Sequence, residues 1–217
     1  MKQLAVLVLV LVPACLWAHS GERPPSCPQD HSIELGLQED VVRHAGCTQL
    51  AGIVMRTGAE LDVAPLGTLE VITGDLTIGP TVAVDELALN GLLRVGGTIR
   101  IANNGMLRGV FLPRLEHAGR IEVDNNAALT TVSVPRLAAV DGAVVITDNA
   151  ALELVSASSL TTVGQELVIA GQGRLTLLEM GKLASAGAVR IERAPKLPAE
   201  VVDQLTRKSA LAIPPSP

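Results

Sequence analysis

Aromatic side chains are nearly absent from this chain of 217 residues, which contains one Trp, one Phe and no Tyr. A core without aromatic rings must be built from Leu, Val, Ile and Ala, and apolar residues make up 48% of the sequence. Aliphatic side chains of this kind fill thin, repeated layers well. The shortage of Trp and Tyr also argues against a sugar-binding site that stacks pyranose rings on aromatic side chains.

Charged residues are also scarce, at 18% of the chain, and the formal net charge is -5. A protein that binds nucleic acid needs a basic face to neutralise phosphates, so nucleic acid is excluded as the expected partner. The chain is long enough for one domain with a buried core. Its apolar content argues against intrinsic disorder.

An unbroken apolar run over residues 4–12 follows Lys2 at the N-terminus. Such a run is too short to span a bilayer as a helix and is typical of an export signal. We therefore predict a signal peptide over residues 1–18, followed by a flexible linker over residues 19–26. No later segment is predicted to span a membrane, so the mature protein is expected in the periplasm, in the extracellular space or at the cell surface.

The end of this signal has two interpretations. Cleavage after Ala18 would leave His19 as the new N-terminus. The run Val-Pro-Ala-Cys that ends at Cys15 also resembles a bacterial lipobox, in which Cys15 would be acylated. In that case the protein would be anchored to a membrane through the lipid on Cys15.

The three cysteines of the chain fit an exported protein. Cys15 is either removed with the signal or carries lipid, which leaves Cys27 and Cys47. An even pair in an oxidising compartment favours a disulfide bond, and two separate buried thiols are the alternative. The bond would close a loop of about 20 residues and stabilise the fold by about 3 kcal/mol on the chain-entropy model.

A short pattern, Gly-x-apolar-x-apolar, recurs along the chain and predicts the fold. Six glycines open copies of this pattern, and one copy is longer by a residue: Gly74, Gly97, Gly119, Gly142, Gly164 and Gly187. The second apolar residues of the copies lie 22 or 23 residues apart, from Ile78 to Ile191. A register of this kind is typical of a β-solenoid, in which each turn lies directly on the previous one.

Each repeat contains two further apolar groups in the same register. A second short strand is predicted at five pairs of positions: 87 and 89, 110 and 112, 132 and 134, 155 and 157, and 178 and 180. A leucine follows three residues later in every repeat: Leu92, Leu115, Leu137, Leu160 and Leu183. Three inward groups per turn predict a coil of roughly triangular cross-section with parallel sheets on its sides, over residues 27–197.

The polar residues between the two strands predict the corners of the coil. Asn104, Asn126 and Asn149 occupy equivalent positions, so we expect them to stack in a column. Asparagine tolerates left-handed backbone conformations and bonds to its equivalents in the turns above and below. The repeated glycines are expected at a bend where a side chain would clash.

Helical caps are predicted at both ends, because a solenoid otherwise exposes an unpaired layer of strands. Residues 33–45 contain a short helical pattern next to the Cys27–Cys47 pair. At the other end, residues 198–208 begin with proline and place apolar side chains on one helical face. Residues 209–217 are predicted to be a disordered tail.

Several runs of this sequence resemble the receptor L domain, the leucine-rich module of insulin and epidermal growth factor receptors. They are CTQLAGIVM from Cys47, LGTLEVITGDLTI from Leu66, and turns of the form LxxVxGxIxIxNNxxL. The resemblance covers about residues 27–205. It implies a right-handed, β-helix-like coil, an N-terminal disulfide between Cys27 and Cys47, and ligand docking on a sheet face. Single-domain relatives occur in fungal cell-wall and bacterial surface proteins. The chain has no cysteine-rich segment and no kinase, so receptor signalling is not implied.

Neither a metal site nor a cofactor site is expected from the four histidines, which are His19, His31, His44 and His117. They lie at different phases of the repeat or outside it. His44 and Cys47 have a spacing that a metal could use, but no further ligand cluster lies nearby in the sequence. His117 follows Glu116, and the two are expected to form a solvated pair at a corner.

Catalysis is not expected either, although some β-helices degrade polysaccharides with paired carboxylates. Glu122 and Asp124 share a strand face, because side chains alternate along a strand. Glu122 should lie one turn from Arg100, so a surface ion pair is the simpler interpretation.

The outward positions of the first strand form the candidate contact face. They are Arg100, Glu122, Val145, Val168 and Arg190. An apolar pair among polar neighbours on a flat sheet suggests a contact site. Alternatively, the two valines are only good strand formers, or the chain's own flanks cover them.

These features together predict an exported, non-catalytic module for binding or adhesion. Its partner would be a protein or an envelope polysaccharide. A structural protein of the cell envelope is the main alternative, and a carbohydrate-active enzyme is a weaker one. Without aromatic anchors, the expected affinity for a protein is low unless copies cluster on a membrane.

Overall fold

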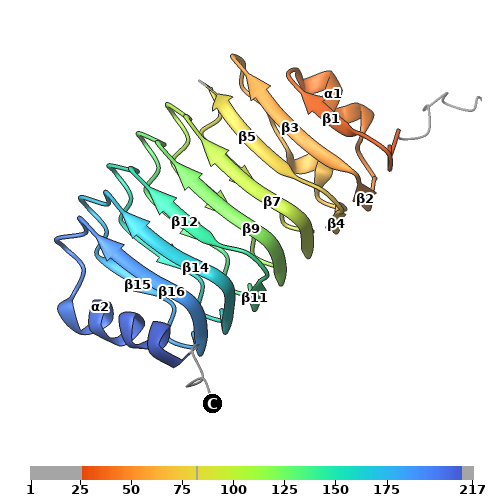
Figure 1. Ribbon diagram of the computed structural model, residues 1–217. Coiled ribbons are helices and arrows are strands. Elements are labelled where there is room, and N and C mark those ends of the chain that lie inside the picture. Colours follow the sequence, from red (N-terminus) through yellow and green to blue (C-terminus); the bar gives the residue numbers. More distant parts are fainter. Residues whose placement is uncertain (1–25, 82, 212–217) are drawn as a thin grey trace, which may run out of the picture.

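A computed structural model describes residues 26–81 and 83–211 and shows a β-solenoid (Figure 1). Each strand pairs in parallel with the equivalent strand of the next turn. Ile146 pairs with Ile169, and Val168 pairs with Arg190, so residues one sequence repeat apart lie side by side. The predicted all-β solenoid, with one repeat for each turn, is therefore confirmed. The predicted signal peptide, the candidate lipidation site Cys15 and His19 lie outside the described residues.

The larger of two sheets has 11 strands and contains the Gly-x-apolar-x-apolar segments. Its strands are β1 (Ser32–Leu35), β2 (Gln49–Leu50), β3 (Gly52–Thr57), β4 (Val71–Ile72), β5 (Leu76–Thr81), β7 (Arg94–Ala102), β9 (His117–Asp124), β11 (Ala139–Val140), β12 (Val144–Thr147), β14 (Thr162–Ala170) and β16 (Ser185–Glu192). The long strands continue around one corner of the coil, so β7 pairs with both β4 and β5.

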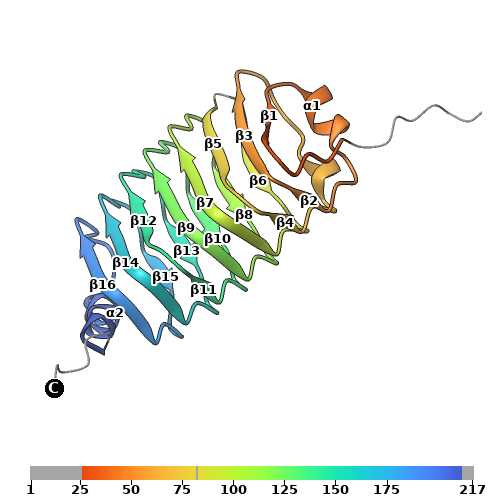
Figure 2. The same ribbon diagram turned by 45° about the vertical axis from the view of Figure 1, so that its right-hand side comes forward.

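A smaller sheet of five strands forms another side of the coil. Its strands are β6 (Glu86–Ala88), β8 (Gly109–Phe111), β10 (Thr131–Ser133), β13 (Leu154–Ser156) and β15 (Leu177–Glu179). They contain the second strand predicted for each repeat. Figure 2 shows these short strands behind the strands of the larger sheet.

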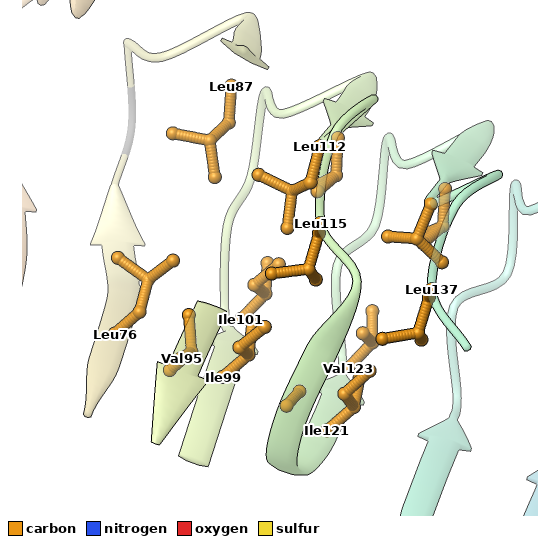
Figure 3. Packing of buried hydrophobic residues seen from close by; sticks show 14 of the residues in the cluster. Leu76, Leu87, Val95, Ile99, Ile101, Leu112, Leu115, Ile121, Val123 and Leu137 are labelled. Carbon is orange, nitrogen blue, oxygen red and sulfur yellow. The ribbon is translucent and has the colours of Figure 1, made fainter. Parts of the chain in front are cut away.

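The space between the sheets is filled by columns of Leu, Val and Ile (Figure 3). In one turn, Ile99 and Ile101 point inward from the larger sheet, and Leu112 and Leu115 lie across from them. The five leucines predicted as a third group are all 0 or 1% exposed. No aromatic side chain belongs to this core among the described residues. The apolar core is therefore packed without aromatic rings.

The glycines that open the repeats lie where neighbouring turns approach most closely. A Cβ atom at Gly187 would be 2.7 Å from the carbonyl oxygen of Gln165 in the previous turn. At Gly164 it would overlap the carbonyl oxygen of Asp141. The predicted clash at this bend is confirmed.

Helices cover both ends of the solenoid, as Figure 1 shows. Helix α1 (Gln38–Arg43) lies beside β1, and helix α2 (Ala199–Thr206) with the 3-10 helix η2 (Arg207–Leu211) lies against β16. A further 3-10 turn, η1 (Ala64–Leu66), contacts α1. The helical segment predicted over residues 33–45 is shorter than expected, because Ser32–Leu35 forms the first strand of the larger sheet. At the other end, helical structure continues to Leu211, three residues into the predicted tail.

A disulfide bond joins Cys27 to Cys47 and ties the segment before β1 to the turn after α1. Cys47 is 1% exposed. Within residues 26–81 and 83–211, no helix has the length and apolar character needed to cross a membrane.

Candidate functional site

The five residues predicted as a contact face form one continuous row on the outer surface of the larger sheet. The strand register places Arg100 beside Glu122, Glu122 beside Val145, Val145 beside Val168, and Val168 beside Arg190. Each residue comes from a different strand, in the order β7, β9, β12, β14 and β16. The solenoid therefore brings together side chains that lie far apart in the sequence.

Ion pairs fix the charged side chains on both sides of the two valines. Arg100 pairs with Glu122 as predicted, and Arg120 Nε lies 2.7 Å from Glu122 Oε1. On the other side, Arg190 Nη2 lies 2.8 Å from Glu166 Oε2. These pairs leave an uncharged strip between them.

The strip contains Val145 and Val168, both half-buried. The alanines two residues away along each strand, Ala143 and Ala170, are 1 and 7% exposed and add little contact area. The strip is therefore a shallow apolar surface between two charged borders, and the exposed parts of the two valines are its main contact area.

Glu122 and Asp124 lie on the same face of β9, as the alternation of side chains predicts. Glu122 accepts from two arginines, and Asp124 Oδ1 accepts a hydrogen bond of 2.8 Å from the hydroxyl of Thr147. Both carboxylates are thus engaged within the sheet.

The smaller sheet presents a second apolar surface that was not predicted from the sequence. Its outward residues include Leu177, which is 49% exposed, and the half-buried Leu154 beside it. Phe111 also lies on this outer side, and its ring covers Gly109, where a Cβ atom would overlap it. The signal was present in the sequence, because the residue before each inward apolar pair must face outward.

The asparagine column is buried inside a corner of the coil. Asn104, Asn126 and Asn149 are all 0% exposed. Asn104 Nδ2 donates to Asn126 Oδ1 at 2.8 Å, and Asn126 Nδ2 donates to Asn149 Oδ1 at 2.9 Å. The stacking that the sequence predicts is therefore observed, and its role is to satisfy polar groups inside the core.

One part of the asparagine prediction is wrong. The left-handed backbone belongs to the residue before each column asparagine, with φ angles of 60° at Asn103, 51° at Asn125 and 51° at Asp148. The preceding residue makes the corner and faces solvent, which turns the next side chain inward. The column residue is therefore free to form the internal hydrogen bonds.

The column ends at Gln172, which occupies the equivalent position in the next turn. Its Nε2 donates to the carbonyl oxygens of Ala170 and Ile146, at 2.8 and 3.1 Å. Its Oε1 is buried and has no hydrogen-bond partner in the part of the chain that the structure describes. Because glutamine is one methylene longer than asparagine, its oxygen does not accept from Asn149 as the shorter side chain would.

The described histidines have different partners, although His31 and His44 line one surface pocket beside α1. His31 pairs with Asp30 at 2.7 Å on the surface, and the buried His44 contacts the carbonyl oxygen of Ser26 through Nδ1. His117 Nε2 lies 2.9 Å from Asp141 Oδ1 in the next turn, so its partner is not the adjacent glutamate that the sequence suggested. Over residues 26–81 and 83–211, no three His, Cys, Asp or Glu side chains are grouped so that they could hold a metal ion.

Two carboxyl groups near the N-terminal end have shifted pKa values. The backbone N–H groups of Leu37 and Gly36 donate to Asp40 Oδ2, at 3.0 and 3.1 Å, and lower the pKa of Asp40. Asp40 thus caps the first turn of α1. The hydrogen bond from His31 lowers the pKa of Asp30.

No protein-family model, no curated protein and no solved structure matches this chain. The fold is therefore established by the structure alone, as a β-solenoid. The likeness to the receptor L domain stays a prediction from the sequence runs described above.

Proposed function

We propose that this protein is an exported, non-catalytic binding or adhesion module that contacts its partner through the outer face of the larger sheet. The observation that carries the proposal is the row from Arg100 to Arg190, in which two half-buried valines lie between ion-paired arginines. Export is supported by the apolar N-terminal run and by the Cys27–Cys47 disulfide, since disulfides persist in oxidising compartments. The partner is a protein or a polysaccharide of the cell envelope.

A rigid sheet face suits this role for an energetic reason. Binding costs conformational entropy for each side chain and loop that becomes ordered in the complex. The backbone of this face is already fixed by hydrogen bonds to the strands on both sides, and its arginines are already held by Glu122 and Glu166. The remaining contact area is small and lacks aromatic anchors, so a single copy is expected to bind weakly.

The engagement of Glu122 and Asp124 by neighbouring side chains supports a non-catalytic role. Glycoside hydrolysis requires two carboxyl groups that are free to act on one bond. Release of reducing sugar from envelope polysaccharide by the purified protein would contradict this part of the proposal.

The binding test is affinity capture from native envelope extracts with the chain from His19 to Pro217. The test variant carries Val145→Asp and Val168→Asp, which place two charges in the apolar strip. The matched control carries Val54→Asp and Thr77→Asp, which are paired outward residues of β3 and β5 in the same row. Circular dichroism and thermal melting serve to check that both variants fold.

The expected result is a specific partner that is captured by the wild-type chain and by the control but is lost with the test variant. If the test variant captures every partner of the wild type, the strip between Glu122 and Arg190 is not the binding site.

A structural role in the envelope is the second candidate. Residues 26–92 carry a net negative charge and residues 171–211 a net positive charge, and opposite charges at opposite ends favour contacts between copies of the chain.

A further inference from the structure

The solenoid is electrically polar along its axis. Residues 26–92, at the N-terminal end, contain ten Asp and Glu side chains and only two arginines. Residues 171–211, at the C-terminal end, contain seven Lys and Arg side chains and four Asp and Glu. Because the turns stack in sequence order, this asymmetry in sequence is also a separation in space (Figure 1).

The N-terminal cap exposes apolar side chains that a terminal cap normally avoids. Leu37 and Val42 of the α1 segment are 55 and 58% exposed, and they are two of the four large exposed hydrophobic residues in the described chain. Glu39 and Asp40 lie in the first turn of α1, and Arg43, in its last turn, pairs with Asp40. The side chain of Gln38 bonds to both the N–H and the carbonyl oxygen of Asp62, which holds the acidic loop at residues 60–62 beside α1.

The C-terminal end carries an apolar groove with a basic border. The groove lies between the end of β16 and α2 and has a volume of about 590 Å³. Its walls include Ile191, Pro195 and Val202. Arg193 lines it and is exposed, although its Nη2 also lies 3.4 Å from Asp148 Oδ1, and exposed Lys196 follows closely in the sequence.

We infer that copies of this chain associate head to tail, with the α1 cap of one copy seated in the C-terminal groove of the next. The apolar residues Leu37 and Val42 would contact the groove, and the acidic residues around α1 would face the basic border. The two surfaces lie at opposite ends of the molecule, so the contact is heterologous. Every assembly keeps a free cap at one end and a free groove at the other, so association extends as an open chain rather than closing as a dimer.

This inference is independent of the outer face proposed for binding, because none of its residues belongs to the row from Arg100 to Arg190. Within one chain, the turns of the solenoid stack along the same axis. Head-to-tail contact continues the same direction between chains and leaves the outer sheet faces uncovered.

The test measures the mass of the chain from His19 to Pro217 by sedimentation velocity over a concentration series at low and high salt. The N-end variant carries Leu37→Asp and Val42→Asp, and its control carries Met106→Asp and Leu177→Asp, which change the other two exposed hydrophobic residues.

The C-end variant carries Arg193→Glu and Lys196→Glu. Its control carries Arg114→Glu and Arg136→Glu, at exposed positions in the middle of the solenoid. Lys196→Glu alone replaces the C-end variant if thermal melting shows that the double variant does not fold.

The wild type and both controls are expected to form species that grow with concentration and shrink with salt. Each end variant is expected to stay monomeric. A mixture of the two end variants is expected to form 1:1 dimers and nothing larger, because one intact cap and one intact groove remain.

Three results would overturn the inference: a wild type that stays monomeric at the highest soluble concentration, assembly that survives both end variants, or a closed dimer that does not grow. A fourth result would also overturn it: self-association of a shortened chain that begins at Ser26, but not of the chain that begins at His19. In that case residues 19–25 of the same chain, and not a second copy, would be the occupant of the other surface. Loss of envelope partners in the Val145→Asp and Val168→Asp variant bears only on the proposed binding face.

Discussion

Asn126 accepts a hydrogen bond from the side chain of Asn104 and donates one to the side chain of Asn149, so it links three successive turns through one buried amide. Its Oδ1 also accepts the backbone N–H of Asn104 at 3.1 Å. A single side chain therefore satisfies polar groups that belong to two turns. The stability of the solenoid depends on such contacts, because each turn touches only its neighbours.

We expect Asn126→Ala to lower the free energy of unfolding by about 2–4 kcal/mol, because it leaves both donors of Asn104 without that acceptor inside the core. Denaturant unfolding followed by circular dichroism measures the change. Asn90→Ala, at an exposed position, is the control and should change the free energy by less than about 0.5 kcal/mol. Equal effects of the two substitutions would show that the column contributes little.

The end of the column at Gln172 leads to a stabilising substitution. Gln172→Asn shortens the side chain so that its oxygen lies where Asn126 and Asn149 place theirs, within reach of Asn149. Removal of one buried, unsatisfied oxygen stabilises the fold, and loss of the packing of one methylene destabilises it. The net rise in the free energy of unfolding is expected to be about 1 kcal/mol. A rise in the melting temperature is the measured outcome. A fall would mean that packing of the longer side chain outweighs its unpaired oxygen.

The Cys27–Cys47 bond should contribute about 3 kcal/mol to stability, since it closes a loop of about 20 residues. The double substitution Cys27→Ser and Cys47→Ser is expected to lower the melting temperature, and reduction of the wild type with dithiothreitol should lower it by a similar amount. The reductant should leave the melting temperature of the double variant unchanged. A shift in that variant would point to an effect of the reductant other than disulfide cleavage.

The capping role of Asp40 makes stability depend on pH. Hydrogen bonds from Leu37 and Gly36 lower its pKa in the folded state below the ordinary value of 3.8. Its contribution is therefore fully present above that value and is lost as the pH falls through the lower, folded pKa. Unfolding free energies of the wild type and of Asp40→Asn should differ at pH 7 and converge as the pH falls through the lowered, folded pKa of Asp40. A constant difference over this range would contradict the assignment.

The repeated part of this fold can be predicted because stacking imposes the same environment on equivalent residues of every turn. Ile101, Val123 and Ile146 pair with one another in register, and each must be apolar for the same reason. The length of one turn therefore appears directly in the sequence as the spacing of its apolar residues. The row from Arg100 to Arg190 follows from the same register, which is why its members can be predicted from the sequence alone.

Features that do not repeat are harder to predict. Ser32–Leu35 keeps the alternating apolar pattern and pairs in register with β3, but serine replaces the opening glycine of the repeat. So short a pattern is also compatible with the start of a helix. We predicted a left-handed backbone at the column position of Asn104, but the structure has it at Asn103. Two adjacent asparagines fit the same sequence pattern, so the pattern does not distinguish them. The exposure of Leu177 can be predicted only if the outward-facing positions of the second strand in each repeat are considered as well as the inward-facing ones.

The register between turns also limits how the length of this protein can change. Excision of residues 127–149 would remove one whole turn and bring Asn126 next to Gln172, with every column still aligned. Loss of a few residues within a turn would instead misalign all the columns that cross it at once. Changes in the length of the coil are therefore tolerated in steps of one complete turn, so related chains are expected to differ by whole multiples of this unit rather than by arbitrary lengths.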